Sequence, residues 1–449
     1  MLDAGSIVGD KYDFVGYNYE GMSSNIKMSE DGKTLIATAK LKQDYYNVAA
    51  DGGKWHDSEG ALNVYKLSSD GNTWELIKQF DGQVEGAMLG YANAISADGN
   101  TIAFTDEYMS ASTGHKGIVH VWRYDGAADA WTELGSGLQY ETPRNLDLFG
   151  RKISMSSDGE TVAVMAKEWA SGEITIWKYN AENNSWAQKG SALNLGTSKT
   201  WVGYSFSLSA NGERILLGNR SRGGVNGYAS VYHYDGIDGD ADNINGWTQL
   251  GDDIYPLDTA DYNDRFGEVV DMSADGTKLV IGDPVKGQFF TFELSESGTD
   301  WTFHAKVPRA LYFVAMSNGG NRIIAGGPNG WGLYDFDGTL EYGDDMNTRN
   351  GLTIAGDGKS VVVTDHYYYD DGRYGRDGRG AIFVYDLGDT CPADYGSMGA
   401  LASPSASGGK FLSVASRVFY SALLAHFNSH RLHSSSNNTP IVSFRYSRR

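Results

Sequence analysis

The chain has 449 residues, of which 58 are glycine, 28 are tyrosine and 11 are tryptophan, and its formal net charge is −20. This charge argues against nucleic acid as the main partner, because phosphate binding needs a net basic surface. The single cysteine, Cys391, excludes both an intramolecular disulfide and a cysteine-rich zinc site.

The first predicted element is a short strand at residues 2–9. Its sequence resembles the segments that follow the fourth strand of later repeats, and the last repeat stops after its third strand, at residues 384–387. We therefore expect residues 2–9 to pair with residues 380–387, which would cover two sheet edges and hold both ends of the repeat region.

From residue 28 onward one phrase recurs: an apolar residue, Ser, a spacer and then Asp-Gly. The seven copies begin at residues 28, 95, 155, 208, 272, 316 and 354, with Asn-Gly in the fourth and imperfect matches in the last two. Asp-Gly or Asn-Gly between two apolar runs indicates a hairpin, because these residues tolerate the positive φ of a tight turn.

Each turn is followed by two further predicted strands. The first is apolar throughout, as at residues 162–164, which is typical of a strand buried on both faces. The second opens with Gly, as at residues 172–177, and alternates Ile174 and Ile176 with Glu173 and Thr175. This period of two predicts one packed face and one wetter face.

A fourth strand begins at a tryptophan in five repeats, at residues 74, 131, 186, 247 and 301. Four antiparallel strands in each of seven repeats predict an all-β chain, a seven-bladed β-propeller of four-stranded blades over residues 1–390, with the N-terminal strand closing the last blade.

Some of these phrases carry a family resemblance. Phe266-Gly267 followed by Gly282-Asp283-Pro284 resembles the FG-GAP repeat of integrin α-subunit propellers, and Phe149-Gly150 is a partial match. The pattern Trp-x-x-Leu-Gly, as at residues 131–135, is similar to FG-GAP-like propeller proteins of algae and other protists.

The resemblance implies a seven-bladed propeller that binds a ligand or partner at a cell surface and has no catalytic residues. It also favours an extracellular or cell-surface location, although residues 1–10 lack the features of a signal peptide. The calcium loops of integrin repeats do not carry over, because the Ser-x-Asp-Gly turn occupies that interval here.

Two sets of residues are candidate sites. Asp238, Asp240 and Asp242 alternate in an acidic loop, and converging carboxylates suit Ca²⁺. The loop departs from the EF-hand pattern at Asn243 and Gln249, which favours a solvated acidic turn instead. The second set lies in the loops between second and third strands, where residues common at recognition surfaces gather: Tyr45, Tyr46, Trp55, His56, Tyr108, Asp365, His366, Tyr367, Tyr368 and Arg373.

The sequence thus favours a non-catalytic scaffold that binds a protein or glycan on these aromatic loops, as a monomer and without a required cofactor. The alternative is a propeller hydrolase or lyase acting on glycans at the central channel. Titratable groups with shifted pKa values at the channel mouth would favour the enzyme, and an apolar or aromatic channel would favour binding.

Residues 391–449 lack the repeat and are rich in Ser, Asn and basic residues. We expect a low-complexity tail that is disordered or contains one short helix, near residues 412–427. No segment of the chain is apolar over the length needed to span a membrane.

Overall fold

The fold is taken from a computed structural model of the chain. The structure describes residues 8–10, 22–39, 60–71, 73–82, 89–106, 117–140, 149–166, 172–193, 200–221, 226–236, 243–244, 246–257, 265–344, 351–365 and 381–387. All the regular secondary structure in these residues is β-strand. Residues 391–449 lie outside them, so the predicted tail and its boundary stay predictions.

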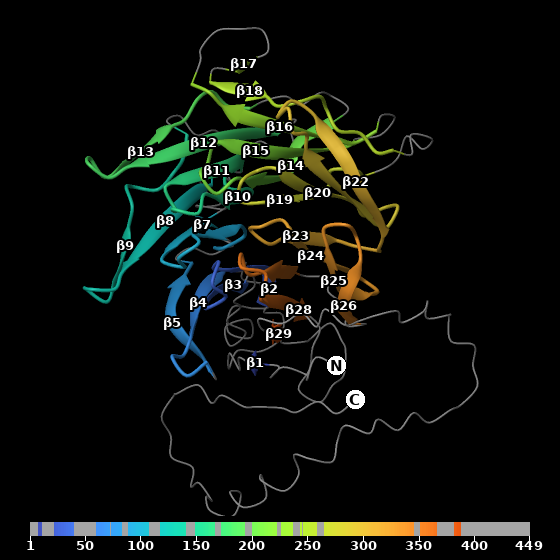
Figure 1. Ribbon diagram of the computed structural model, residues 1–449. Helices are drawn as coiled ribbons and strands as arrows, with labels where there is room; N and C mark the ends of the chain where they lie inside the picture. Colours follow the sequence, from blue (N-terminus) through green and yellow to red (C-terminus); the bar gives the residue numbers. More distant parts are fainter. Residues whose placement is uncertain are drawn as a thin grey trace, which may run out of the picture. The chain divides into compact units, whose positions relative to one another are not determined.

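Seven antiparallel sheets follow one another in chain order around a common centre, as the colour sequence in Figure 1 shows. The first strand of each sheet lies innermost, and these inner strands are β2 (Met22–Met28), β6 (Asn93–Ile95), β10 (Lys152–Met155), β14 (Thr200–Leu208), β19 (Val269–Met272), β23 (Phe313–Met316) and β27 (Gly351–Ile354). The second strands are β3 (Thr34–Ala39), β7 (Thr101–Asp106), β11 (Thr161–Ala166), β15 (Arg214–Ser221), β20 (Lys278–Asp283), β24 (Arg322–Gly327) and β28 (Ser360–Asp365).

The two remaining strands complete each blade. The third strands are β4 (Ala61–Leu67), β8 (Ile118–Asp125), β12 (Glu173–Asn180), β16 (Tyr228–Tyr234), β21 (Gln288–Leu294), β25 (Gly330–Asp335) and β29 (Ala381–Asp386). The outer strands are β5 (Trp74–Asp81), β9 (Ala130–Glu133), β13 (Ser185–Gln188), β18 (Trp247–Gln249), β22 (Trp301–Pro308), β26 (Leu340–Asp344) and β1 (Val8–Asp10). Blade 4 has a fifth strand, β17 (Asn243–Ile244), which pairs with β18. The predicted seven-bladed β-propeller is confirmed.

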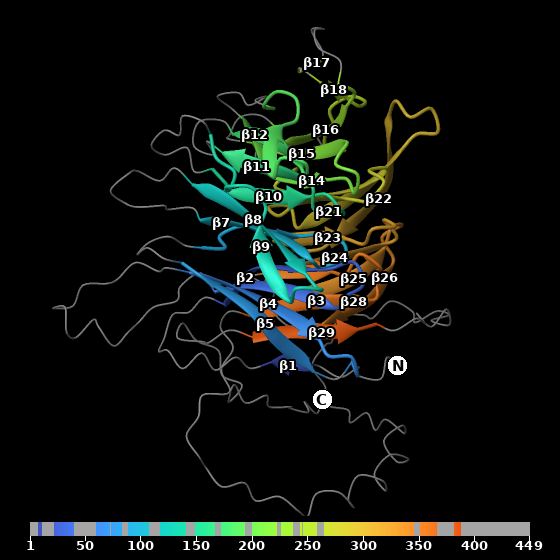
Figure 2. The same cartoon turned by 90° about the vertical axis from the view of Figure 1, so that its left-hand side faces the viewer.

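The last blade is closed by the N-terminal strand, as predicted, and residues 2–7 of the predicted strand lie outside the described residues. β1 pairs antiparallel with β29, with Val8 opposite Val384, Gly9 opposite Phe383 and Asp10 opposite Ile382. Figure 2 shows β1 beside β29 from a second direction. Because β1 precedes blade 1 in the chain, this pairing joins the two ends of the ring.

The Ser-x-Asp-Gly phrase forms the turn between the first and second strands. In blade 2 the Ser96 hydroxyl accepts the Thr101 backbone N–H at 2.9 Å and donates to Asp98 Oδ1 at 2.5 Å. Gly99 has a φ of 71°. A Cβ there would lie 2.5 Å from Thr34 Oγ1 in the preceding blade, so both the turn and the blade contact require glycine.

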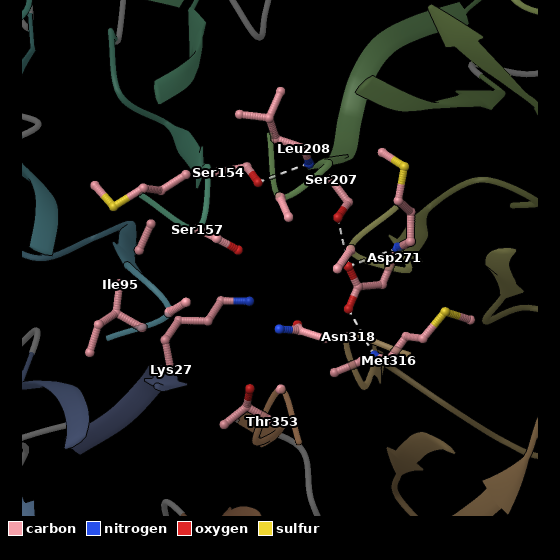
Figure 3. Close-up of a pocket in the computed structure, with 18 of the residues that line it drawn as sticks. Lys27, Ile95, Ser154, Ser157, Ser207, Leu208, Asp271, Met316, Asn318 and Thr353 are labelled. Atoms are coloured by element: carbon pink, nitrogen blue, oxygen red, sulfur yellow. Dashed lines mark hydrogen bonds between the residues drawn. The ribbon is translucent and has the colours of Figure 1, made fainter. Parts of the chain in front are cut away.

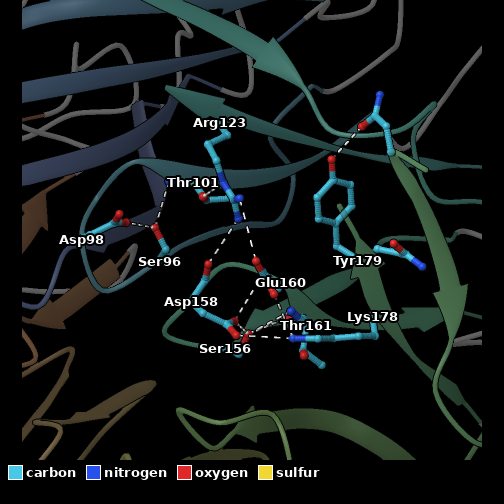
Figure 4. A network of polar contacts seen from close by, with 12 residues as sticks. Ser96, Asp98, Thr101, Arg123, Ser156, Asp158, Glu160, Thr161, Lys178 and Tyr179 are labelled. Carbon is cyan, nitrogen blue, oxygen red and sulfur yellow. Dashed lines mark hydrogen bonds and ion pairs between the residues drawn. The ribbon is translucent and has the colours of Figure 1, made fainter. Parts of the chain in front are cut away.

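The spacer residue of this turn joins each blade to the next. The N–H of each spacer residue donates to the carbonyl of the spacer residue in the next blade, at 2.8–3.0 Å, in the order Glu30, Ala97, Ser157, Ala210, Ala274, Asn318 and Gly356. The series closes where Asp357 N–H donates to the Glu30 carbonyl. We call these seven spacer residues the turn ring. Figure 4 shows a second tie on this face, where Arg123 Nε donates to Thr101 Oγ1 at 2.9 Å and Nη2 reaches the Asp158 carbonyl of blade 3 at 3.3 Å.

The core lies between neighbouring blades. Ile174 and Ile176 of blade 3 pack with Leu217 and Trp247 of blade 4 in one buried cluster. The expectation of a wetter face on residues 172–177 was wrong, because Glu173 and Thr175 are also buried. A blade inside the ring is covered on both sides, so its third strand has no solvent face where it enters the core.

The Phe-Gly phrases also have a packing role. Phe149 and Phe266 are fully buried. A Cβ on Gly117 would lie 2.0 Å from the Phe149 carbonyl oxygen, and one on Gly227 would lie 2.1 Å from that of Phe266. The glycine that opens each of these third strands therefore allows the Phe-Gly backbone to approach it closely.

Candidate functional site

A cavity of about 220 Å³ lies where the inner strands of all seven blades end. The ends of these strands and the residues of the turn ring line it. Pockets for drug-sized ligands measure roughly 300–1,000 Å³. The channel mouth is therefore suited to a small molecule rather than to an oligosaccharide.

One position of the repeat faces this cavity in every blade, two residues before the Ser of the turn, or before Ala355 in blade 7. We call these the channel positions, and all of them line the cavity: Lys27, Ala94, Ser154, Ser207, Asp271, Ala315 and Thr353. Only Lys27 and Asp271 among them are charged, and they come from blades 1 and 5.

Asp271 ties three blades together. Its Oδ1 accepts hydrogen bonds from the Ser207 hydroxyl of blade 4 at 2.7 Å and from the N–H of the next residue, Met272, at 2.9 Å. Its Oδ2 accepts a hydrogen bond from the Met316 N–H of blade 6 at 2.8 Å. Ser154 acts similarly, since its Oγ accepts the Leu208 N–H at 3.0 Å. Figure 3 shows these bonds along one wall of the cavity. They satisfy inner-edge backbone groups that no further strand covers.

Three other lining side chains do not tie blades together in this way. Lys27 is exposed to the cavity, and the structure shows no ion pair or hydrogen bond between its ammonium and any other described residue. In Figure 3 the Lys27 ammonium, the Asn318 amide and the Ser157 hydroxyl point into the same space. These three side chains therefore present hydrogen-bond donors and one positive charge, and Glu30, on the same blade as Lys27, adds one carboxylate to the lining.

The described lining residues include neither His nor Cys. Both serines at the channel positions are already engaged, Ser154 with Leu208 N–H and Ser207 with Asp271. The arrangement offers charge and hydrogen bonds to a ligand.

On the opposite face of the ring, a charged cluster lies at the other ends of blades 3 to 5. Arg220 Nε forms an ion pair with Glu268 Oε2 at 3.5 Å, and the Arg220 guanidinium lies 4.6 Å from the centre of the Tyr204 ring. Burial raises the pKa of Glu268 above its ordinary value, although the nearby charges of Arg220, Arg265 and Lys152 act in the opposite direction. The cluster is internally paired.

The residues predicted as sites from the sequence lie almost entirely outside the described part of the chain. This holds for Asp238, Asp240 and Asp242 and for the aromatic loop residues, with the exception of Asp365, whose backbone ends β28 opposite Ala381. Within the described ranges, no group of three or more His, Cys, Asp or Glu side chains is arranged to hold a metal ion. In those ranges there is also no helix long and apolar enough to cross a membrane.

The sequence did contain a signal for the channel site. Aligning the repeats on their turns places Lys27 and Asp271 at the same position as Ala94, Ser154, Ser207, Ala315 and Thr353. A charged residue on the inner strand of a propeller faces the channel or a neighbouring blade. Lys27 and Asp271 are charged where the other five repeats have uncharged residues, and this difference indicates a site.

Comparison with known proteins supports the fold. No protein-family model and no curated protein matches the chain. The periplasmic gluconolactonase of Pseudomonas aeruginosa is 14% identical with a TM-score of 0.50, over 77% of this chain and 97% of that one. The Cps50 (Swd1) β-propeller domain of Myceliophteria thermophila is 10% identical with a TM-score of 0.52, over 85% and 99%. Hydrazine synthase of Kuenenia stuttgartiensis is 14% identical with a TM-score of 0.51, over 84% and 98%.

At these identities the likeness shows the β-propeller fold alone. The resemblance to FG-GAP repeats stays a prediction, because no family model matches the chain and these structures are other propellers.

Proposed function

We propose that this chain is a non-catalytic binding propeller that holds a small polar ligand at the mouth of its central channel. The observation that carries the proposal is the contrast between two sets of side chains that line the cavity. One set ties blades together, and the other set, Lys27, Asn318 and Ser157, has side chains with no hydrogen-bond partner in the described structure. Polar side chains in a pocket that lack protein partners are available to a ligand.

The hydrolase or lyase alternative is less well supported. A propeller enzyme would need a nucleophile or general base free to act on a substrate. The Ser207 hydroxyl and the Asp271 carboxylate contact each other, but that carboxylate also accepts two backbone N–H groups and joins three blades. We therefore favour binding over catalysis at this site.

The aromatic loops stay a second proposed surface, for a protein or glycan. Tyr367 and Tyr368 are the residues on which that proposal depends most, and both lie outside the described residues.

The channel site can be tested by blocking its mouth. Ala210 belongs to the turn ring, is partly exposed and lines the cavity. Ala210→Phe would fill the entrance and leave the backbone hydrogen bonds of the ring in place. We would screen small acids, amines, amino acids and sugars against the full chain by ligand-observed NMR, and we expect the compounds that bind to lose binding in this variant.

The matched control is Ala127→Phe, which adds the same ring to an exposed turn of blade 2, away from the cavity. Compounds should bind this control as they bind the unmodified chain. Compounds that still bind Ala210→Phe, or a screen in which none binds, would overturn the channel site as the functional site.

A further inference from the structure

We propose that the channel mouth selects a small monocarboxylate, with Lys27 as its counter-ion. This inference rests on the proposed binding function and names the chemical class of the ligand. It is argued from the charge of Lys27, from the backbone groups around it, and from the position of Asp271 across the cavity.

The first argument is the isolation of Lys27. At the channel positions of the neighbouring blades stand Ala94 and Thr353, and neither brings a negative charge to the ammonium. Lys27 thus faces a cavity that every blade lines, with no carboxylate among the described residues paired to it. An ammonium in a pocket is stabilised by an anion that replaces part of its hydration.

The second argument is the inner-edge backbone. Ser29 N–H donates to the Thr34 carbonyl of β3, so the N–H one residue earlier, at Met28, points away from β3 and toward the channel. Three of the seven equivalent N–H groups donate to a side chain: those of Leu208, Met272 and Met316. The other four have no such acceptor in the described structure, and their residues line the cavity: Met28, Ile95, Met155 and Ile354.

The two arguments define the ligand group. Lys27 and the free inner-edge N–H groups can only donate hydrogen bonds, and the Asn318 amide and the Ser157 hydroxyl can donate as well as accept them. A carboxylate only accepts hydrogen bonds, through two oxygens that can each take more than one. Charge-assisted bonds of this kind are roughly twice as strong as neutral ones.

Two carboxylates of the lining limit the charge of the ligand. The Asp271 carboxylate lies across the cavity from Lys27 in Figure 3, and Glu30, on the same blade as Lys27, belongs to the lining as well. A second anionic group on the ligand would face these carboxylates without a cation to offset them. A cavity of about 220 Å³ also has room within it for only a short acid. The site therefore favours one carboxylate on a short chain over a dicarboxylate or a phosphate dianion.

The test measures binding of propionate, succinate, inorganic phosphate and propionamide to the full chain by isothermal titration calorimetry and NMR. At pH 8 propionate should bind best, because propionamide lacks the charge, and succinate and phosphate, which is then mainly the dianion, carry a second charge. Lys27→Met keeps the length of the side chain and removes the ammonium. It should weaken propionate binding by ~10-fold or more, the value of one charge-assisted hydrogen bond.

The matched control is Lys33→Met, which removes one positive charge from an exposed site on the same blade, where Lys33 lies 3.7 Å from Asp31. It should leave propionate binding unchanged. Equal propionate binding by Lys27→Met and the unmodified chain, or tighter binding of phosphate or succinate, would overturn the inference. If neutral compounds bind and are lost in Ala210→Phe while Lys27→Met has no effect, the channel site stands and the monocarboxylate does not.

Discussion

At the scale of single residues, the aspartate of the Ser-x-Asp-Gly turn connects local geometry to stability. Asp98 accepts the Ser96 hydroxyl and the Asn100 backbone N–H. Burial alone would raise the pKa of Asp98, but these hydrogen bonds and the charge of Arg123 together lower it below its ordinary value. The pKa values of Asp158 and Asp275 are lowered against burial in the same way. Carboxylates whose pKa is lower in the folded state stabilise the fold above pH ~4, and this stabilisation is lost as the pH falls through the folded pKa.

This link can be measured with Asp98→Asn. Asn211 holds the same position in blade 4 and accepts the corresponding bonds from Ser209 and Glu213, so the amide fits the turn. We expect the free energy of unfolding to fall by up to ~1 kcal/mol at pH 7, since the group is partly exposed. The loss should shrink at pH 3, and urea titrations at both values would show it. Asn211→Asp should change stability in the opposite direction at pH 7, whereas an equal loss at both pH values would assign the effect to geometry.

At the scale of elements, the outer-strand tryptophans join consecutive blades. Trp186 Nε1 donates to the Leu134 carbonyl at 2.8 Å, and Trp301 Nε1 donates to the Leu250 carbonyl at 2.8 Å. Each acceptor belongs to a Trp-x-x-Leu-Gly phrase of the preceding blade. The glycine that ends the phrase leaves room for the tryptophan ring, because a Cβ on Gly135 would lie 2.8 Å from Trp186 Cδ1.

Two alanine substitutions separate the blade contact from backbone strain. Gly135 and Gly71 have φ values of 70° and 71°, but a Cβ on Gly71 would meet nothing within 4 Å. Gly71→Ala should cost only the backbone strain of an alanine at positive φ, about 1–2 kcal/mol. Gly135→Ala should cost a further ~1–3 kcal/mol, because the added methyl group displaces the Trp186 ring. Thermal and urea unfolding would measure both, and equal costs would show that the tryptophan contact contributes little.

The elements were more predictable from the sequence than their contacts. The Asp-Gly turns and apolar runs are local signals, so they predicted the hairpins and the second strands. Burial of Glu173 and Thr175 was missed because it depends on the neighbouring blades, which no local pattern encodes. The aromatic loops were predicted as a binding site from their composition. Lys27 and Asp271 can be recognised as site residues only when the repeats are aligned and their common position is known to face the channel.

At the scale of the whole molecule, the ring is held closed in two places. The turn ring closes through backbone hydrogen bonds, the last running from Asp357 N–H to the Glu30 carbonyl at 2.8 Å. The last blade closes through β1 and β29. Both closures join residues that are far apart in the chain, so the cost in chain entropy is offset only when the other blades are in place. The channel-mouth site shares this property, because its lining comes from every blade.

The β1–β29 closure can be tested by a covalent link in register. Val8 lies opposite Val384, whereas Phe383 lies one residue out of register and points to the other face of the strand. With Cys391 changed to Ser, Val8→Cys with Val384→Cys should form a disulfide on oxidation, and Val8→Cys with Phe383→Cys should not. The link constrains a very long loop, so the first pair should gain up to ~5 kcal/mol when oxidised and lose that gain on reduction. Mass spectrometry and melting temperatures with and without reductant would measure both effects. Efficient oxidation of the out-of-register pair, or of neither pair, would show that the last blade is closed in some other way.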